Sequence, residues 1–405
     1  MGITRRSALI AAASSVLTVT AACGAPTSSG AGGDSNGEVP QKPKKAVTLN
    51  VLDVAGNLQL TQGMIDEFVK NNPDVISRVT YSKSPAPELA GKIKAQQNAG
   101  RVDIGLVLTG VDGLAAGIDQ GLWMDVLPTF EDRLPGMKDY LEPAAAMQKL
   151  AGNAGVTVTY YPSGPLLEYL PAKVPNPPTT ADQLLAYAKA HPGKVQYARP
   201  SNSGPGRTFL MGLPYILGDK DPKDPVNGWD KTWAYLKELN QYVSYYPSGT
   251  TETMKNLANG SVQVIASTTG WDINPRVLAT VPKDAKVSSM QGFHWVTDAH
   301  YAVIPKGAST DTQAAVLALL QFMLTPQQQA KAFDDGYFYP GPAVKGVELS
   351  MAPQKSQDAI KNFGRPEYDA LIANNPTEVP LDPKALVAAF DRWDREIGSG
   401  KVKQG

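Results

Sequence analysis

The 405-residue sequence has few of the residues from which crosslinks and metal centres are built. It holds one cysteine and three histidines, which excludes an intramolecular disulfide framework and a cysteine-rich zinc site and leaves little for a histidine-built metal centre. Neither positive nor negative charge is in excess, because 38 basic side chains balance 38 acidic ones. A nucleic-acid-binding protein needs a basic surface to neutralise phosphates. We therefore expect no nucleic-acid partner, no metal and no cofactor.

Long hydrophobic runs are also missing, apart from an uncharged apolar run between Arg6 and Cys23. Such a run, after basic residues and before small ones, is typical of an export signal. Thr4-Arg5-Arg6 resembles a twin-arginine signal and Ala21-Ala22-Cys23 resembles a lipobox, with a plain secretory cut as the alternative. We expect a signal peptide over 1–22 and a lipidated Cys23. The product would lie in the periplasm or on the outer face of the cytoplasmic membrane, held to the membrane surface by its lipid.

The next stretch, residues 23–45, is rich in Gly, Ser, Ala and Pro, so it predicts a flexible tether. Beyond it, β-rich apolar runs at 47–54, 76–82 and 103–108 alternate with helical spacing over 60–69 and 87–99. This β-α-β-α-β order predicts an open parallel sheet, whose ligand crevice lies beyond the carboxyl ends of the strands.

A second α/β segment follows. It has strand patterns at 156–161, 194–199, 260–266 and 301–304 and helix patterns at 181–190, 207–215, 229–243 and 312–324, with Thr179 or Thr180 as a helix cap. Two α/β lobes joined by two crossings is the simplest interpretation. The residues leave open whether the tail from Met351 packs on one lobe or bridges both.

Five stretches, in this order and spacing, resemble the extracellular solute-binding proteins of ABC importers, the class that includes polyamine, iron and thiamine binders. They are 178–184, 202–209, 265–271, 294–305 and 319–329. The resemblance implies a two-lobed periplasmic-binding-protein fold (type II), with mostly parallel sheets flanked by helices and a hinge between the lobes. It implies a monomer without catalysis that closes on a small solute and delivers it to an ABC permease and its ATPase.

These observations divide the chain as follows. We expect the signal over 1–22, the tether over 23–45, the first part of lobe 1 over 46–155, lobe 2 over 156–297, a return to lobe 1 with the hinge over 298–345, and a helical C-terminal segment over 346–405.

The most promising site residues precede a predicted helix: Ser201, Asn202, Ser203 and Gly204, with Arg207 in its first turn. Hydroxyls and free N–H groups at a helix start can hold an anion, and a guanidinium adds a charged fork. The alternative is simple helix capping with a solvated arginine.

An indole and a carboxylate make a cation receptor, which suggests Trp295 and Asp298. The resemblance supports this pair, although polyamine binders have one residue fewer between the two; the alternatives are a core tryptophan and a hinge hydrogen bond. By the same resemblance Trp271, which follows Thr269 and precedes Asp272, forms a stacking wall; the alternative is that Trp271 and Asp272 cap the next helix or face solvent. A tyrosine over the cleft corresponds to Tyr337 or Tyr339. Topological position alone adds Asn57, Thr109 and Tyr161. His294 and His300 are expected to be structural.

An anion site facing a cation site suits a thiamine-like solute first, a polyamine second and an oxyanion or ferric ion third. Two other functions compete with solute binding. One is a secreted hydrolase or lyase on the same fold, although the sequence has no Gly-x-Ser-x-Gly, Ser-x-x-Lys, His-Glu-x-x-His or Walker motif. The other is a surface scaffold with no small-molecule affinity.

Overall fold

The computed structural model describes residues 37–54 and 56–403. The predicted signal peptide, the lipidation of Cys23 and most of the predicted tether therefore lie outside the described residues. Within the described residues, no helix combines the length and the hydropathy that crossing a bilayer requires.

The larger sheet has the strand order β11-β4-β10-β3-β1-β2, with β12 paired to β10. Its strands are β1 (Val47–Asp53), β2 (Ile76–Lys83), β3 (Leu106–Thr109), β4 (Val156–Gly164), β10 (Trp295–Val303), β11 (Gly341–Pro342) and β12 (Thr377–Glu378). The pairs β1-β2 and β1-β3 are parallel, as the β-α-β pattern predicts, whereas β10 runs antiparallel to both β3 and β4. The sheet is therefore mixed. Its antiparallel part arises because β4 and β10, which run between the two sheets, point in opposite directions.

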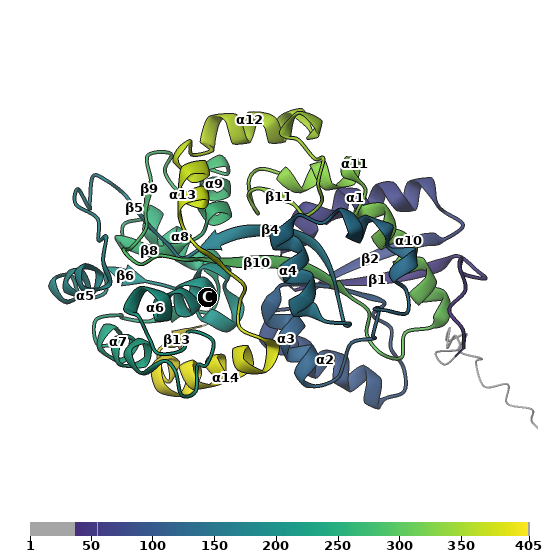
Figure 1. Cartoon of the computed structure of the whole chain (residues 1–405), viewed down its shortest axis with the longest axis horizontal. Coiled ribbons are helices and arrows are strands. Elements are labelled where there is room, and N and C mark those ends of the chain that lie inside the picture. Colours follow the sequence, from purple (N-terminus) through teal and green to yellow (C-terminus); the bar gives the residue numbers. More distant parts are fainter. Residues whose placement is uncertain (1–36, 55, 404–405) are drawn as a thin grey trace, which may run out of the picture. The chain divides into compact units, whose positions relative to one another are not determined.

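Helices cover both faces of this sheet because its strands bury alternate side chains on opposite faces. Leu49 and Val51 of β1 belong to the apolar cluster that includes α1 (Leu58–Asn71) and α10 (Thr310–Met323), whereas Leu52 belongs to the cluster of α2 (Ala86–Asn98) and α3 (Val111–Asp119). Figure 1 shows α2 and α3 together on one side of the strands. The helix α4 (Glu142–Ala151) packs on β4.

The smaller sheet has the order β6-β8-β5-β9 and is also mixed, since β6 and β8 are parallel and β5 is antiparallel to both of its neighbours. Its strands are β5 (Leu166–Tyr169), β6 (Val195–Gln196), β8 (Val264–Ser267) and β9 (Lys286–Ser288). Its helices are α5 (Ala181–Ala190), α6 (Gly204–Leu217), α7 (Asp230–Asn240), α8 (Thr250–Ala258) and α9 (Thr269–Val277). Thr180 caps α5 through a 3.1 Å hydrogen bond that it accepts from the Gln183 N–H, which confirms one of the two predicted caps.

Two strands connect the sheets. β4 begins in the larger sheet and leads directly into β5, and the chain returns from β9 into β10. We call each sheet with its helices a lobe, the large-sheet lobe and the small-sheet lobe, and we call β4 and β10 the hinge strands. The two-lobed α/β fold that the resemblance implies is thus confirmed, but the mostly parallel sheets that it also implies are wrong, because strands of both sheets pair antiparallel.

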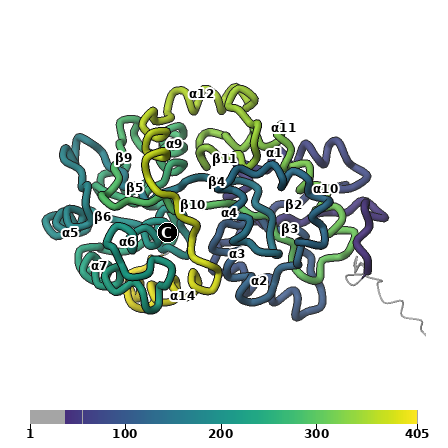
Figure 2. Tube along the Cα trace, viewed as in Figure 1, coloured from purple at the N-terminus to yellow at the C-terminus, as the bar shows by residue number. Residues whose placement is uncertain are grey.

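The C-terminal segment makes a third passage between the lobes, which the sequence left open. After α11 (Pro326–Gln329) and β11 it forms α12 (Gln354–Phe363), α13 (Glu367–Asn374) and α14 (Pro383–Trp393). Trp393 packs edge-on against Tyr246 of the small-sheet lobe, β13 (Val402–Lys403) pairs with β7 (Tyr246–Pro247), and α14 also packs on α3 of the large-sheet lobe. Figure 2 shows this segment passing across the hinge strands before α14. The tail therefore contacts both lobes.

Candidate functional site

Five helices begin at one cavity, because the loops that follow the strand ends of both lobes converge there. The starts of α1 and α3 come from the large-sheet lobe, and those of α6, α8 and α9 come from the small-sheet lobe. Ser203 caps α6 by accepting a 3.1 Å hydrogen bond from the Gly206 N–H, and Thr268 caps α9 in the same way. Gly249 has no side chain to cap α8. The first-turn N–H groups of α8 can therefore serve a bound group.

The cavity has a volume of about 290 Å³ and takes wall residues from both lobes and from both hinge strands. It is lined by Val54, Gly56, Asp112, Tyr161, Asn202, Ser203, Gly204, Arg207, Gly249, Thr250, Thr251, Trp271, Asp298, His300, Tyr337 and Phe338. Among the described residues, no group of three or more His, Cys, Asp or Glu side chains is placed to hold a metal ion.

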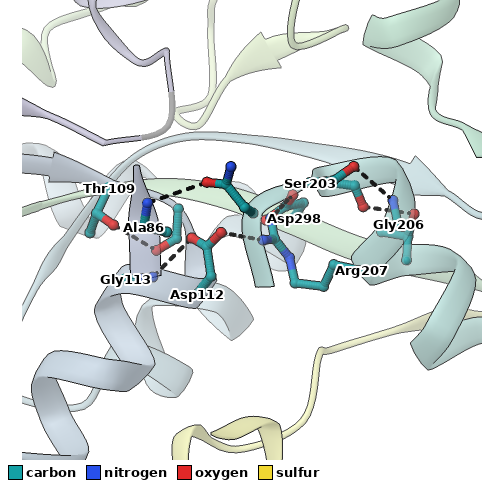
Figure 3. Close-up of polar contacts among 12 residues, drawn as sticks. Ala86, Thr109, Asp112, Gly113, Ser203, Gly206, Arg207 and Asp298 are labelled. Atoms are coloured by element: carbon teal, nitrogen blue, oxygen red, sulfur yellow. Dashed lines mark hydrogen bonds and ion pairs between the residues drawn. The ribbon is translucent and has the colours of Figure 1, made fainter. Parts of the chain in front are cut away.

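Among the described residues of this wall, Arg207 is the only lysine or arginine, and it forms ion pairs with two carboxylates. Its Nη1 donates to Asp112 Oδ2 at 2.9 Å and its Nη2 to Asp298 Oδ2 at 2.5 Å (Figure 3). Burial alone would lower the pKa of Arg207, but Asp298 and Asp112 raise it overall. Burial raises the pKa of Asp298 above its usual range, although Arg207 opposes that change. The wall therefore holds two acidic groups and one permanent cation.

Aromatic rings form the apolar part of the wall. Phe338 packs against Tyr161, with ring centroids 3.7 Å apart, and against His300, at 4.1 Å. Trp271 meets Tyr337 edge-on at 5.6 Å. Gly56 makes room for that tyrosine: it has φ +71°, and a Cβ there would lie 2.6 Å from the Tyr337 hydroxyl. Rings in this arrangement can stack on a planar or cationic solute.

His300 contributes an uncharged polar group to the floor of the cavity. Its side chain is 4% exposed and its Nδ1 has no hydrogen-bond partner. Burial and the neighbouring Arg207 lower its pKa to about 3. The imidazole is therefore neutral at pH 7 and offers one donor and one acceptor.

The structure brings together many of the residues suggested by the sequence and places the others elsewhere. Those that line the cavity are Tyr161, Asn202, Ser203, Gly204, Arg207, Trp271, Asp298 and Tyr337. Those outside its lining are Asn57, Thr109, Ser201, Thr269, Asp272, Trp295 and Tyr339.

Two of the outlying residues have structural partners of their own. Asp272 is fully buried and receives hydrogen bonds from Arg276, Arg365 and Tyr368. Trp295 packs edge-on against Phe293, in an apolar cluster on α13, and its indole N–H donates to the Leu371 carbonyl at 3.1 Å.

The remaining outlying residues either make hydrogen bonds to backbone carbonyls or are buried without a partner. Thr269 donates to the Tyr339 carbonyl at 2.9 Å, and Thr109 donates to the Gly110 carbonyl at 3.3 Å. The Asn57 amide and the Ser201 hydroxyl are buried without a hydrogen-bond partner.

Several wall residues were not suggested by the sequence. Asp112 stands three residues after Thr109, at the carboxyl end of the third strand, so topological position could have indicated it. Thr250 and Thr251 directly follow Pro247-Ser248-Gly249, and such a turn-like stretch before two threonines could have indicated a helix start. His300 lies on β10 two residues after Asp298, and residues two apart share a strand face. Val54 and Gly56 follow the first strand, so topological position indicates them in the same way, whereas Gly249 and Phe338 gave no comparable signal.

Comparisons with known proteins agree with this architecture. A family model for bacterial extracellular solute-binding proteins matches residues 63–362. The chain is 25% identical over 323 residues to Protein YnjB of Escherichia coli (strain K12), which covers 73% of this chain and 75% of that protein.

Two solved structures illustrate the likeness of fold. A putative spermidine/putrescine ABC transporter from Listeria monocytogenes matches with a TM-score of 0.61 at 17% identity, covering 87% of this chain and 99% of that one. The periplasmic binding protein AfuA from Actinobacillus pleuropneumoniae, with fructose-6-phosphate bound, matches with a TM-score of 0.61 at 16% identity and the same coverage.

Proposed function

Because the chain belongs to the family of bacterial extracellular solute-binding proteins, we propose that its interlobe cavity captures a small solute outside the cell and that the protein then delivers it to an ABC permease. The observation that carries this proposal is the cavity itself, in which side chains from both lobes and both hinge strands meet. The family binds solutes and is not a family of enzymes, so the alternative of a hydrolase or lyase falls away. Export by the N-terminal signal and attachment through Cys23 belong to the same proposal.

The charges of the wall favour a solute with a cationic part. Asp112 and Asp298 outnumber Arg207, and the rings of Trp271 and Tyr337 lie in the same wall. A cation that sits near carboxylates and aromatic faces gains from both, by roughly 1–2 kcal/mol from the rings when it is desolvated. A simple oxyanion does not need this wall.

The start of α8 favours a second, hydroxyl or anionic, part of the same solute. Thr250 and Thr251 lie in the wall, and the uncapped N–H groups of this turn carry the positive end of the helix dipole. A cationic aromatic solute with a hydroxyl or phosphate tail, such as thiamine or thiamine monophosphate, has this form. We therefore propose a thiamine-like solute first.

A polyamine is the second candidate, and one observation favours it. Free Arg207 would repel a polyamine, but both terminal nitrogens of Arg207 are paired with carboxylates, so the repulsion is reduced. A ferric ion has less support, because no group of three or more His, Cys, Asp or Glu side chains is placed to hold a metal ion in the described part of the chain.

The proposal is tested by native mass spectrometry of the purified protein before and after mild denaturation. We expect a released small cation with an aromatic ring, or a raised melting temperature with thiamine or thiamine monophosphate in a panel that also contains spermidine and phosphate. A response to spermidine alone would select the second candidate. No released molecule and no shift with any member of the panel would contradict solute binding of this kind.

A further inference from the structure

We propose that Asp112 is a positioning residue: it holds Arg207 across the cleft and stabilises the closed arrangement of the two lobes. This inference concerns the cavity of the proposed function and rests on the premise that the lobes open and close around it. The sequence did not suggest Asp112, and its role differs from that of a residue that simply touches the solute.

The two members of this ion pair belong to different lobes. Asp112 lies in the first turn of α3, which follows β3 of the larger sheet, whereas Arg207 lies in α6, which packs on β8 of the smaller sheet. They are 95 residues apart in the chain. A rotation of the lobes about the hinge strands that separates α3 from α6 would therefore break this pair.

The pair is also well shielded from water. The side chains of Arg207 and Asp112 are 5% and 9% exposed, and Arg207 Nη1 lies 2.9 Å from Asp112 Oδ2. A charge-assisted hydrogen bond in such surroundings is stronger than one at the surface, where water screens it. The other carboxylate partner, Asp298, lies on hinge strand β10. Of the two carboxylates, Asp112 is thus the one that joins α6 to the large-sheet lobe.

A second contact joins the lobes close to this ion pair (Figure 3). The N–H of Ala86, the first residue of α2, donates to Asn202 Oδ1 at 3.3 Å. Asn202 belongs to the turn before α6, and its own amide donates to the Ser248 carbonyl at 2.8 Å. Both contacts therefore join the starts of α2 and α3 to the start of α6 at one edge of the cavity.

The ion pair has a consequence for the solute. Both terminal nitrogens of Arg207 are paired, Nη1 with Asp112 and Nη2 with Asp298, so an anionic group that approached them would meet two carboxylates. The anionic or hydroxyl part of a solute is therefore directed to the start of α8, and Arg207 acts in closure and in positioning Asp298.

The test measures the distance between the lobes in protein that carries no solute. Spin labels are placed at the exposed residues Lys92 in α2 and Ala186 in α5, as cysteine variants of the full chain in which Cys23→Ser removes the native thiol. Double electron–electron resonance then gives the distribution of distances between the two spin labels in the parent, in Asp112→Asn and in Asp119→Asn. The last is a matched control, because Asp119 is an exposed carboxylate at the other end of the same helix.

We expect Asp112→Asn to move the distribution towards longer distances and to lower the ratio of closed to open protein by about tenfold, the effect of losing one hydrogen bond between charged groups. Asp119→Asn should match the parent. Asp112→Ser, whose side chain is too short to reach Arg207, repeats the test if the asparagine variant does not fold.

Distributions for both Asp112 variants that superimpose on the parent distribution would overturn the inference. The measurement needs no solute, so its outcome does not depend on the proposed function. If no solute is found, a shifted distribution still supports the role of Asp112. If a solute is found, an unchanged distribution still contradicts that role.

Discussion

Arg365, in the C-terminal segment, and Asp272, in α9, form a buried bidentate ion pair. Arg365 Nε lies 2.6 Å from Asp272 Oδ2 and Nη2 lies 2.5 Å from Oδ1, and the two side chains are 6% and 0% exposed. The Tyr368 hydroxyl also donates to this carboxylate. Asp272 directly follows Trp271 of the cavity wall. The C-terminal segment is therefore fastened to the helix whose first turn forms part of the candidate site.

Replacing Arg365 should destabilise the fold. Arg365→Met removes one partner of a buried carboxylate, and breaking a buried pair in this way costs about 3 kcal/mol or more because the remaining charge stays desolvated. Arg276, which also pairs with Asp272, keeps the loss near the lower end of that range. Urea unfolding followed by circular dichroism measures it.

The matched control for Arg365 is Arg101→Met. Arg101 also pairs with an aspartate, Asp103, at 2.9 Å, but the two side chains are 73% and 50% exposed. Exposed pairs contribute about 0–1 kcal/mol. Equal losses of unfolding free energy in the two variants would contradict a special role for the buried pair.

His300 should make the solute-free protein less stable in mild acid. Its pKa is about 3 in the folded protein and about 6.5 in the unfolded chain. Between these values the unfolded chain binds a proton that the folded protein does not, so stability falls as the pH is lowered. From pH 7 to pH 5 this amounts to about 2 kcal/mol.

The measurement for His300 compares the free energy of unfolding at pH 7 and pH 5 in the parent and in His300→Gln. The variant should lose about 2 kcal/mol less than the parent over this interval. His191→Gln, which replaces an exposed histidine, is measured alongside as the control substitution. An unchanged dependence in His300→Gln would show that the side chain titrates normally.

The strands and helices that carry the site follow from local patterns in the sequence. The apolar run at 47–54, the cap at Thr180 and the polar turn before α6 all depend on neighbours in the chain, and the structure has them where the sequence places them. Which of Trp295 and Asp298 faces the cavity does not follow from such patterns. Side chains alternate between the faces of a strand, and residues three apart on a regular strand point to opposite faces.

The segments packed against β10 decide which of its faces is the cavity. One side of this strand receives α13 and buries Trp295, whereas Asp298 meets Arg207. The partners of Arg207 and Asp272 are likewise distant in the chain, at Asp112 and Arg365. A single sequence does not predict such pairings, because any of its many aspartates could form an ion pair with any of its arginines.

The two tryptophans should respond differently to truncation. Trp271 is partly exposed in the cavity wall, whereas Trp295 is 0% exposed. Trp271→Ala should weaken the binding of a cationic solute by about tenfold, the effect of losing a desolvated cation–π contact. Trp295→Ala should instead lower the free energy of unfolding by about 3–5 kcal/mol.

Isothermal titration with thiamine, or with the molecule released from the protein, measures the first effect, and urea unfolding measures the second. If Trp295→Ala folds stably but loses solute affinity, Trp295 binds the cationic part of the solute, as the sequence suggested. Full affinity in Trp271→Ala would remove that ring from the site.

Filling the cavity should block binding without unfolding the protein. A Cβ on Gly204 would lie 3.3 Å from the Tyr161 hydroxyl and 3.4 Å from Asp298 Oδ2, so the methyl groups of Gly204→Val occupy the space of a solute. We expect affinity to fall by about tenfold or more, since the displaced solute loses several contacts. Gly91→Val is the control, because Gly91 is also helical and a Cβ there meets nothing within 4 Å. Similar affinities for the two variants would argue that the solute binds elsewhere.

The most direct test of the central claim is a crystal structure of the protein with its solute, either retained through purification or added as thiamine. The account predicts the solute between the lobes, with its cationic part within contact of Asp298 and Trp271 and its hydroxyl or phosphate at the start of α8. A solute that lies outside the cavity between the lobes, with Asp298, Trp271 and Thr250 untouched, would contradict it.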